Sequence, residues 1–231
     1  KITMNKNTLS LLPCSFIWIF MVSLIPSEAP AQYMPQDHWY QEKTVNRPDM
    51  PGLLAPRGIA VSENDEIFVA EIENNRISVW DENGTLIRAW GSNGANDGQF
   101  KKPTGIASFE GKVYVTEWEG HRVQVFDENG NFLRKWGGYG TADGQFKNPW
   151  GIAVDRDSNG TQIYVTDGNG HRVQVFDENG TLIRKWGSDG GGDNQLNYPT
   201  GIAIGPDGLV YLNSRNNHKV KVFQKNGNYM S

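Results

Sequence analysis

The chain has 231 residues, of which 37% are apolar and 21% are charged, and these fractions are typical of a globular protein. Its formal net charge is −4, and without residues 1–31, which contain Lys1, Lys6 and Glu28, the charge would be −5. This acidic balance gives no support for a polyphosphate-binding face, so we expect no nucleic acid among the partners.

The N-terminal segment has the pattern of an export signal. The apolar stretch Leu11–Ile25 follows a short polar region, and Ala29-Pro30-Ala31 has the small-x-small pattern of a cleavage site. We expect residues 1–31 to be a signal peptide and the mature protein to be secreted, periplasmic or extracellular, with no membrane span. An uncleaved signal anchor is the alternative, although the stretch is shorter than the ~20 residues that span a bilayer. The only cysteine, Cys14, lies in this segment, so the mature protein would contain no disulfide.

Residues 32–55 are predicted to form a lead-in segment. Within this segment, Trp39–Thr44 resembles a weakly preserved β-strand. We predict that it completes the last of the strand-rich units described below and so closes a ring. An ordered coil that crosses one face of the protein is the alternative.

From residue 56 onward the chain is a repeat. The sequence P-x-G-I-A occurs at Pro56, Pro103, Pro149 and Pro199, with spacings of 47, 46 and 50 residues. The ten residues H-R-V-Q-V-F-D-E-N-G at 121–130 recur unchanged at 171–180. A period of ~40–50 residues indicates a propeller, a solenoid or an array. The units are 56–102, 103–148, 149–198 and the incomplete 199–231.

Each complete unit contains four short β-type runs. In the second complete unit they are Ile106–Ser108, Val113–Glu117, Val123–Phe126 and Phe132–Trp136. The third run alternates apolar and polar residues, and Asn-Gly joins it to the fourth, which is a strong hairpin signal. Four antiparallel strands per unit, repeated radially, predict an all-β propeller. The basic pairs in the fourth runs, such as Arg134-Lys135, are expected to protect an outer edge strand from aggregation.

At this point the residues resemble a known family. The series P-x-G-I-A-V, I-Y-V-T-D, G-H-R-V-Q-V-F-D, L-I-R-K-W-G and D-G-Q-F-x-x-P is similar to NHL repeats over residues 56–231. The resemblance implies a β-propeller, and NHL propellers usually have five or six blades. Three full units and most of a fourth are present. We therefore predict either a closed four-bladed ring or a fragment of a five- or six-bladed ring.

Ligand-binding residues are expected where the units differ. In a propeller, the loops from strand two to strand three share one face with the loops that lead into the next unit, and specificity is usually placed in such loops. The residue after each repeat proline also varies, and it is expected near the mouth of the central channel. Aromatic and arginine side chains favour binding hot spots. We therefore select Arg57, Trp118, Tyr139, Trp150 and Arg215 as candidate contacts for a protein, peptide or glycan. The alternative for each is packing against a neighbouring loop.

Three histidines occupy one repeat position. These are His121, His171 and His218, and Asn75 holds that position in the first unit. Equivalent positions lie around a ring, too far apart for one zinc ion with bonds of ~2.0–2.1 Å. We therefore expect each side chain to bond to the backbone of a loop.

The sequence has one weak calcium pattern and three glycosylation sequons. Asp155, Asp157 and Asn159 match the first half of a calcium loop, but Thr166 stands where such loops have a bidentate Glu. These residue types also form turns. Asn83, Asn159 and Asn179 each begin the sequence Asn-Gly-Thr, and whether they are glycosylated depends on the secretory pathway. We expect no cofactor.

The resemblance also defines an alternative function. In the peptidyl-hydroxyglycine amidating-type lyase, whose blades are NHL-like, the zinc-binding histidines follow the blade proline. In this chain that position holds Arg57, Thr104, Trp150 and Thr200. Lactonase-type propellers bind a central calcium and have strongly divergent blades, whereas these units are alike. We therefore expect an exported, non-catalytic binding module, with a metal-dependent lyase or lactone hydrolase as the alternative.

Overall fold

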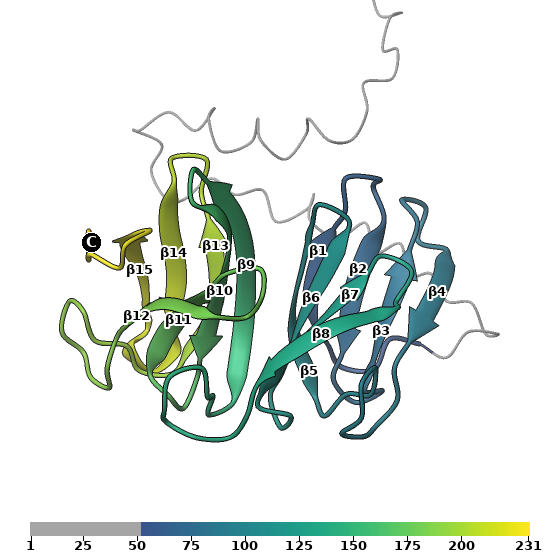
Figure 1. Ribbon diagram of the computed structural model, residues 1–231, viewed down its shortest axis with the longest axis horizontal. Coiled ribbons are helices and arrows are strands. Elements are labelled where there is room, and N and C mark those ends of the chain that lie inside the picture. The colour runs from purple at the N-terminus through teal and green to yellow at the C-terminus, as the bar shows by residue number, and fades with distance from the viewer. Residues whose placement is uncertain (1–51) are drawn as a thin grey trace, which may run out of the picture. The chain divides into compact units, whose positions relative to one another are not determined.

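The computed structural model describes residues 52–231, which form four antiparallel β-sheets (Figure 1). The predicted signal peptide, most of the lead-in segment and Trp39–Thr44 lie outside the described residues. Among residues 52–231 the only helical element is the 3-10 turn η2 (Arg215–Asn217).

Each sheet runs in chain order from its first strand to its last. Blade 1 contains β1 (Pro56–Val61), β2 (Ile67–Glu71), β3 (Arg76–Trp80) and β4 (Leu86–Trp90). Blade 2 contains β5 (Pro103–Phe109), β6 (Lys112–Glu117), β7 (Arg122–Asp127) and β8 (Phe132–Gly137). Blade 3 contains β9 (Pro149–Asp157), β10 (Gly160–Asp167), β11 (Arg172–Phe176) and β12 (Leu182–Trp186). Blade 4 contains β13 (Pro199–Ile204), β14 (Leu209–Ser214) and β15 (Lys219–Gln224).

The sheets are arranged as propeller blades. The first strands pack side by side, β1 with β5, β5 with β9 and β9 with β13, and so form the inner row of the arrangement. The fourth sheet has three strands, and residues 228–231 begin a further pairing with β15 through the bonds Met230 N–H to Val222 O and Val222 N–H to Ser231 O, both 2.8 Å. The predicted all-β propeller of antiparallel blades is confirmed.

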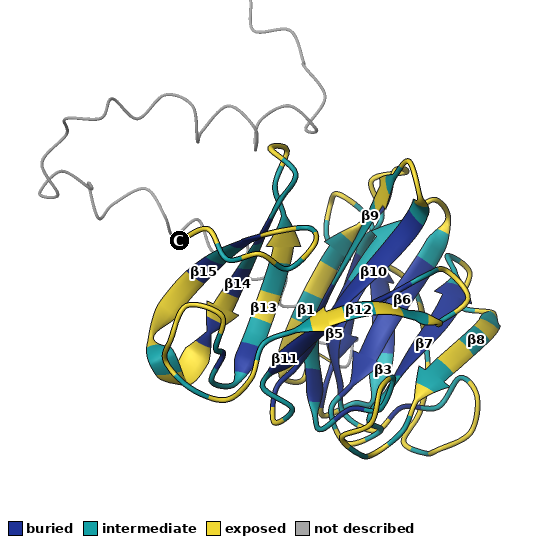
Figure 2. Ribbon diagram, turned by 60° about the vertical axis from the view of Figure 1, so that its left-hand side comes forward, coloured by how far each residue is buried: buried dark blue, intermediate teal, exposed yellow. Residues whose placement is uncertain are grey.

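The hydrophobic core lies between consecutive blades. Figure 2 shows that the buried positions concentrate on the middle strands of the sheets. Between blades 2 and 3, for example, Val123 and Tyr114 of one sheet pack in the same cluster as Ile152 and Val165 of the next, and Trp136 covers it. The period-two alternation of each strand supplies one apolar set for the preceding interface and another for the following interface.

Arginines of the outer strands contact the next blade, which corrects the interpretation of the arginine in each basic pair, whereas Lys135 and Lys185 remain exposed on the outer strands. The Nε atoms of Arg88 and Arg184 donate to the carbonyl oxygens of Glu128 and Lys225, at 3.0 and 2.6 Å. Arg134 donates to Glu178 O through Nη1. These arginines therefore cap the turn of the following blade, because that turn lies over the fourth strand. They do not form a solvent-facing edge.

The same turn explains one of the repeated glycines. Gly130 has φ +87°, and a Cβ there would lie 2.6 Å from the Trp90 ring of the preceding blade. Gly111, in the turn before β6, has φ +71° but has no atom within 4 Å of such a Cβ. Gly130 therefore meets a conformational and a packing requirement, whereas Gly111 meets only the first.

Gly130→Ala is expected to lower the free energy of unfolding by about 1–3 kcal/mol more than Gly111→Ala, because it adds overpacking against Trp90 to a similar backbone strain. Urea denaturation of both variants measures the difference. Equal losses would show that the Trp90 ring moves aside without cost.

Candidate ligand-binding site at the channel mouth

The entry of each inner strand has a repeated backbone geometry. The residue before the blade proline is left-handed in all four copies, with φ 48° at Ala55, 59° at Lys102, 60° at Asn148 and 54° at Tyr198. Such conformations are sparsely populated by non-glycine residues, so the surrounding bonds must hold them. The sharp turn directs the residue after the proline toward the central channel.

A cavity of about 400 Å³ opens on the channel. It is lined by the residue after each blade proline and by the Gly-Ile pair that follows it. Thr104 is buried here, and its Oγ1 lies 3.2 Å from Thr116 Oγ1 and 3.1 Å from Pro149 O, so it is used in packing. Arg57 and Trp150 are the lining residues with large side chains that reach the opening.

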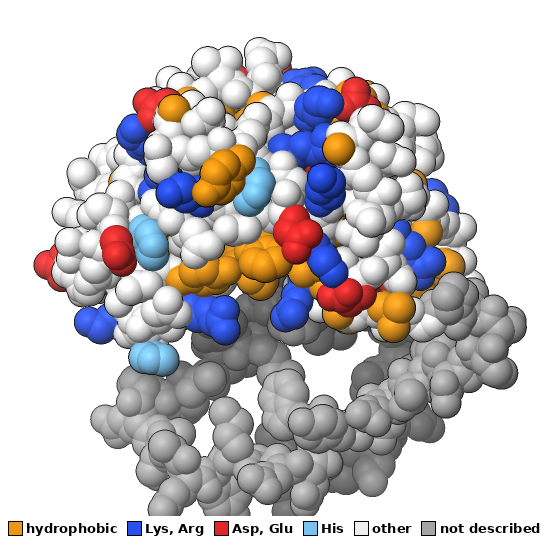
Figure 3. Space-filling model, turned by 90° about the horizontal axis from the view of Figure 1, so that it is seen from below, with side chains coloured by type: hydrophobic (Ala, Val, Ile, Leu, Met, Phe, Trp, Pro, Cys, Tyr) orange, Lys and Arg blue, Asp and Glu red, His pale blue; other side chains and the backbone are white. Residues whose placement is uncertain are grey.

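Trp150 is fixed in place and has charged and aromatic neighbours. Its Nε1 donates to the Tyr198 hydroxyl at 2.9 Å, and the Arg57 guanidinium lies 6.0 Å from its ring centroid. On the other side, the guanidinium of Arg215 lies 5.6 Å from the Tyr198 ring. We call Arg57, Trp150, Tyr198 and Arg215 the channel-mouth cluster. Figure 3 shows this face of the protein, where hydrophobic side chains gather in the middle and Lys and Arg side chains flank them.

The sequence analysis selected three members of the channel-mouth cluster and missed Tyr198. The missed residue directly precedes a blade proline, where the other units have Ala55, Lys102 and Asn148. That position varies as much as the one after the proline, so the signal was present in the sequence.

The structure does not bring the other two candidate residues to the channel-mouth cluster. Trp118 is outside the lining of the cavity, and its Nε1 is buried without a hydrogen-bond partner among the described residues. Tyr139 is exposed on a loop, where its ring lies 4.9 Å from the His121 ring. Tyr139 therefore contacts the turn between β6 and β7 and not the channel-mouth cluster.

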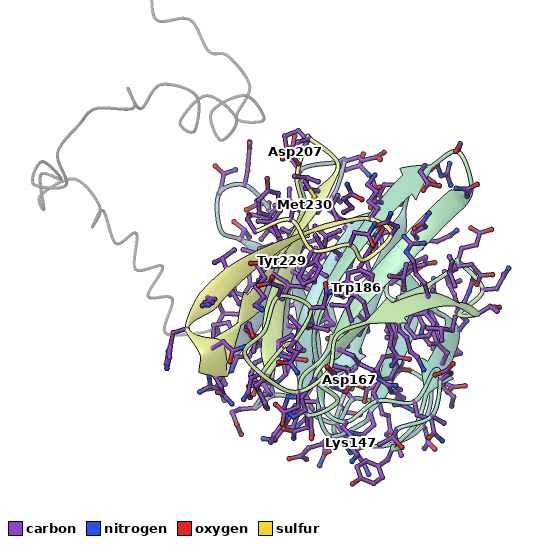
Figure 4. All side chains as sticks on the ribbon, turned by 90° about the vertical axis from the view of Figure 1, so that its left-hand side faces the viewer. Lys147, Asp167, Trp186, Asp207, Tyr229 and Met230 are labelled. Atoms are coloured by element: carbon purple, nitrogen blue, oxygen red, sulfur yellow. The ribbon has the colours of Figure 1, made fainter. Side chains whose placement is uncertain are left out.

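Buried carboxylates support the loops around the cavity. Glu117, at the end of β6, is fully buried and accepts bonds from Arg122 Nε at 2.5 Å and from the Lys101 N–H at 2.8 Å. Asp167 in blade 3 is held in the same way by Arg172 Nε at 3.0 Å and the Lys147 N–H at 2.6 Å. Figure 4 shows Asp167 and Lys147 at the loop end of the blades and Asp207 at the opposite end.

The arginines of these pairs also bind the loops. Arg122 donates to the carbonyl oxygens of Ala95, at 2.6 Å, and Gln99, at 2.8 Å. Arg172 donates in the same way to Thr141 and Gln145, at 2.9 and 2.7 Å. Each pair therefore connects the second strand of one blade to the loop that arrives from the preceding blade. The sequence analysis missed this role, although an acid five residues before an arginine recurs in three units.

Burial sets the acidity of these carboxyl groups. It raises the pKa of Glu117 and of Asp167 above their ordinary values, against the lowering effect of their arginine partners and of backbone N–H groups. In blade 1, burial also acts to raise the pKa of Glu71, but hydrogen bonds from Arg76, Ser78 and Asn74 together bring it below its ordinary value.

Blade 4 anchors the loop from the preceding blade with different residues. Ser214 replaces the carboxylate, and its hydroxyl accepts the Asn197 N–H at 2.9 Å. The cation is Lys221, two residues further along the third strand than the arginines, and its Nζ donates to Asp193 O at 3.1 Å and Gln195 O at 2.9 Å. Burial lowers the pKa of the Lys221 ammonium. In blades 2, 3 and 4, a cationic side chain thus holds the loop that arrives from the preceding blade.

Two of the three repeat histidines, His121 and His171, bond to the backbone as the sequence analysis expected. Nδ1 of His121 accepts the Asn148 N–H at 3.2 Å, and Nδ1 of His171 accepts the Tyr198 N–H at 3.3 Å. In blade 1, Oδ1 of Asn75 accepts the Lys102 N–H at 2.8 Å. The position therefore joins each blade to the left-handed residue that leads into the next one.

This bond gives a pH-dependent contribution to stability. Burial lowers the pKa of His121 from its ordinary value of 6.5, with a smaller opposing effect of Glu119. The unfolded chain then binds a proton at this imidazole more readily than the folded protein, so stability is lost as the pH falls through about 6.5 toward the lower native pKa.

His121→Asn keeps an acceptor, as Asn75 does, but does not titrate. Urea midpoints between pH 8 and 5 should fall less steeply for this variant than for the wild type. Parallel curves would contradict the assignment.

The acidic residues of the calcium pattern make turn and inter-blade contacts. Asp157 Oδ1 accepts the Asn159 N–H at 2.7 Å, its Oδ2 accepts from Gln162 Nε2 at 2.5 Å, and Asp155 pairs with Lys225. In residues 52–231, no group of three or more His, Cys, Asp or Glu side chains is arranged to hold a metal ion. Asn83, Asn159 and Asn179 are exposed in turns. No helix in the described part of the chain is long and apolar enough to cross a membrane.

Comparisons with known proteins agree with this geometry. The NHL repeat family model matches residues 100–126 and 146–176, which include His121, His171 and β11. The chain is an NHL-repeat β-propeller. None of the curated proteins compared with this propeller matches it significantly in sequence.

Solved structures share the fold of this NHL propeller at low sequence identity. A catalytically inactive virginiamycin B lyase from Staphylococcus aureus with quinupristin has 22% identity and a TM-score of 0.57, over 76% of this chain and 54% of the lyase. A nidogen/laminin complex gives 20% identity and a TM-score of 0.57, over 76% and 62%. An auxiliary nutrient binding protein from Bacteroides thetaiotaomicron gives 12% and 0.56, over 71% and 46%. The chain thus spans about half the length of the lyases that it matches.

Proposed function

We propose that this propeller is an exported, non-catalytic binding module that holds a protein, peptide or glycan at its channel mouth. The observation that carries the proposal is the channel-mouth cluster, in which Arg57 and Trp150 line a 400 Å³ cavity and Tyr198 and Arg215 extend the cluster from Trp150. Aromatic and arginine side chains in such a concave setting are the residues that contribute most to binding energy.

The channel-mouth cluster is organised before any ligand arrives. The Trp150 indole is held by Tyr198 and lies against Gly168, where a Cβ would come within 2.8 Å of the ring. The loop before β9 is anchored by Arg172 and Gln174, which both donate to Gln145 O. A preorganised surface loses little conformational entropy on binding, and that favours affinity.

The chemistry of the channel-mouth cluster favours a ligand with both flat and acidic parts. The ring faces of Trp150 and Tyr198 suit the apolar faces of sugars or of aliphatic side chains. The guanidinium groups of Arg57 and Arg215 suit carboxylates, which they can bind in a bidentate manner. An acidic peptide or an acidic glycan supplies both features.

The comparisons support binding as one role of this fold. Two of the similar structures are described as a nidogen/laminin complex and as a nutrient binding protein. Others are described as virginiamycin B lyase and streptogramin B lyase, which favours an enzyme as the second candidate. The sequence analysis gives that candidate as a metal-dependent lyase or lactone hydrolase. Metal analysis of the purified full chain separates the two candidates. A tightly held stoichiometric zinc or calcium ion would favour the enzyme.

The binding proposal is tested by probing arrays of acidic peptides and acidic glycans with the full chain. Arg57→Gln should remove the signal at the spots that the wild type binds. Lys112→Gln, which removes one positive charge at the start of β6 at the opposite end of the blade, should leave the signal unchanged. Binding that survives in Arg57→Gln would contradict the placement of the site.

A further inference from the structure

Each loop that leads from one blade to the next has an equivalent position near its start. Asn93, Tyr139 and Asp189 occupy this position, and each forms an isolated parallel bridge with an apolar residue further along its loop. The Tyr139 ring lies 4.9 Å from the His121 ring, whereas Oδ1 of Asp189 lies 3.4 Å from Nδ1 of His171. One repeat histidine thus has an aromatic neighbour, and the other has an acidic one.

Nδ1 of His171 has two partners within reach, and its protonation state selects between them. Without a proton, Nδ1 accepts the Tyr198 N–H at 3.3 Å. With a proton, Nδ1 can no longer accept this bond, but it can donate to Oδ1 of Asp189 at 3.4 Å. The two bonds use the same nitrogen atom, so each excludes the other. The second partner already lies at ion-pair distance.

Both side chains of this pair reach the solvent. The His171 side chain is 26% exposed, and the Asp189 side chain is 67% exposed. Figure 3 shows histidine side chains, in pale blue, at the surface of the loop face. Imidazole is the side chain that ordinarily changes its charge between about pH 5 and 8. A mildly acidic solvent can therefore supply the proton that selects the second bond.

The other charged groups around His171 have partners of their own. β10 and β11 bring Asp167 and Arg172, which pair with each other at 3.0 Å. The turn after β14 brings Arg215, whose guanidinium lies over an aromatic ring of the channel-mouth cluster. In the part of the chain that the structure describes, Asp189 is the acid that pairs with His171. A protonated imidazole is therefore attracted to this carboxylate.

Tyr198 connects the His171 bond to the channel-mouth cluster. Its backbone is left-handed, with φ 54°, and such a conformation persists only where surrounding bonds hold it. Its hydroxyl accepts the Trp150 Nε1–H at 2.9 Å, so a shift of Tyr198 also frees the Trp150 indole. Loss of the bond to the Tyr198 N–H therefore removes a restraint on both rings.

We propose that His171 and Asp189 form a proton switch that controls the channel-mouth cluster. At neutral pH, Nδ1 of His171 accepts the Tyr198 N–H and holds the cluster in its observed arrangement. On acidification the imidazole takes up a proton, its Nδ1–H donates to Asp189, and Tyr198 is released. Weaker ligand binding at acidic pH follows, and this consequence rests on the proposed function, whereas the release of Tyr198 does not.

Nuclear magnetic resonance of the full chain, labelled with ¹⁵N in tyrosine and tryptophan, tests the switch without a ligand. The Tyr198 amide and the Trp150 indole are assigned from the signals that Tyr198→Phe and Trp150→Phe lose. Between about pH 8 and 5, both signals should titrate together in the wild type. His171→Asn should abolish this titration, because Asn75 holds the equivalent N–H in blade 1 without titrating. Asp189→Asn should shift the midpoint to lower pH.

Asp193→Asn is the matched control, because it removes an exposed carboxylate from the same loop, and it should leave the titration unchanged. His121 is present in all of these variants, so a titration that depends on it would persist in His171→Asn and would overturn the proposal. Signals that do not titrate, or an Asp189→Asn variant that titrates like the wild type, would overturn it too. If the arrays show no bound peptide or glycan, the proposed function fails, and the titration still decides the switch.

Discussion

Glu117→Ala is expected to lower the free energy of unfolding by about 3–5 kcal/mol. Glu117 is fully buried, and its carboxylate accepts bonds from Arg122, from the Lys101 N–H and from Gln124 Nε2 at 2.8 Å. The variant leaves a largely buried guanidinium without its anion and leaves two further donors unsatisfied. Urea denaturation at neutral pH measures the loss.

Blade 4 supplies a matched control for this prediction. The triple variant Glu117→Ser, Arg122→Lys, Gln124→Lys copies Ser214, Lys219 and Lys221 into blade 2. The lysine introduced by Gln124→Lys would bind the loop carbonyl oxygens as Lys221 does. The triple variant should therefore be clearly more stable than Glu117→Ala. A triple variant as unstable as the single one, or a single loss below about 1 kcal/mol, would contradict the structural role of these networks.

Phe176→Ala is expected to cost about 3–5 kcal/mol of the free energy of unfolding. The Phe176 ring is fully buried, and its centroid lies 5.6 Å from those of both Trp136 and Phe146. Trp136 comes from blade 2, so the cavity opens in the interface between two blades and little can move to fill it. Thermal or urea unfolding measures the loss.

The control for Phe176→Ala is Leu133→Ala on the outer strand of blade 2. Leu133 is exposed, so its truncation should cost less than about 1 kcal/mol. A similar cost for both variants would mean that the outer surface contributes as much as the interface between blades. That result would contradict a core placed between the blades.

Local signals were sufficient to predict the blades. The alternation of Val123, Gln124, Val125 and Phe126 and the Asn129-Gly130 turn depend only on residues close together in the chain. The structure has β7 and β8 joined at this turn. Because the units are repeats, the strands predicted for one unit also predict the strands of the others.

Contacts between blades were harder to predict, because each joins residues far apart in the chain. Glu117 resembles an ordinary polar end of a strand, and only the loop from the preceding blade makes it buried. Arg134 resembles an edge charge until the Glu178 turn covers it. The backbone-bonding role of the repeat histidine was predicted by exclusion. Its three copies lie around a ring, too far apart to share one metal ion.

The candidate site was predicted in part. The position after the blade proline was enough to select Arg57 and Trp150, since every copy of that position must face the channel. Variation in a loop selected Trp118 and Tyr139 as well, but variation does not indicate the direction of a side chain. Tyr198 was missed because the position before the proline is defined mainly by its left-handed backbone. The contact between its side chain and Trp150 forms only in the folded protein.

The central claim is that a ligand binds at the channel mouth, and calorimetric titration of the strongest array ligand tests it most directly. The account predicts that Arg57→Gln and Arg215→Gln each raise the Kd at least tenfold, while Lys112→Gln leaves it unchanged and all three variants melt as the wild type does. Equal affinity for all four proteins, or a loss for Lys112→Gln alone, would contradict the account.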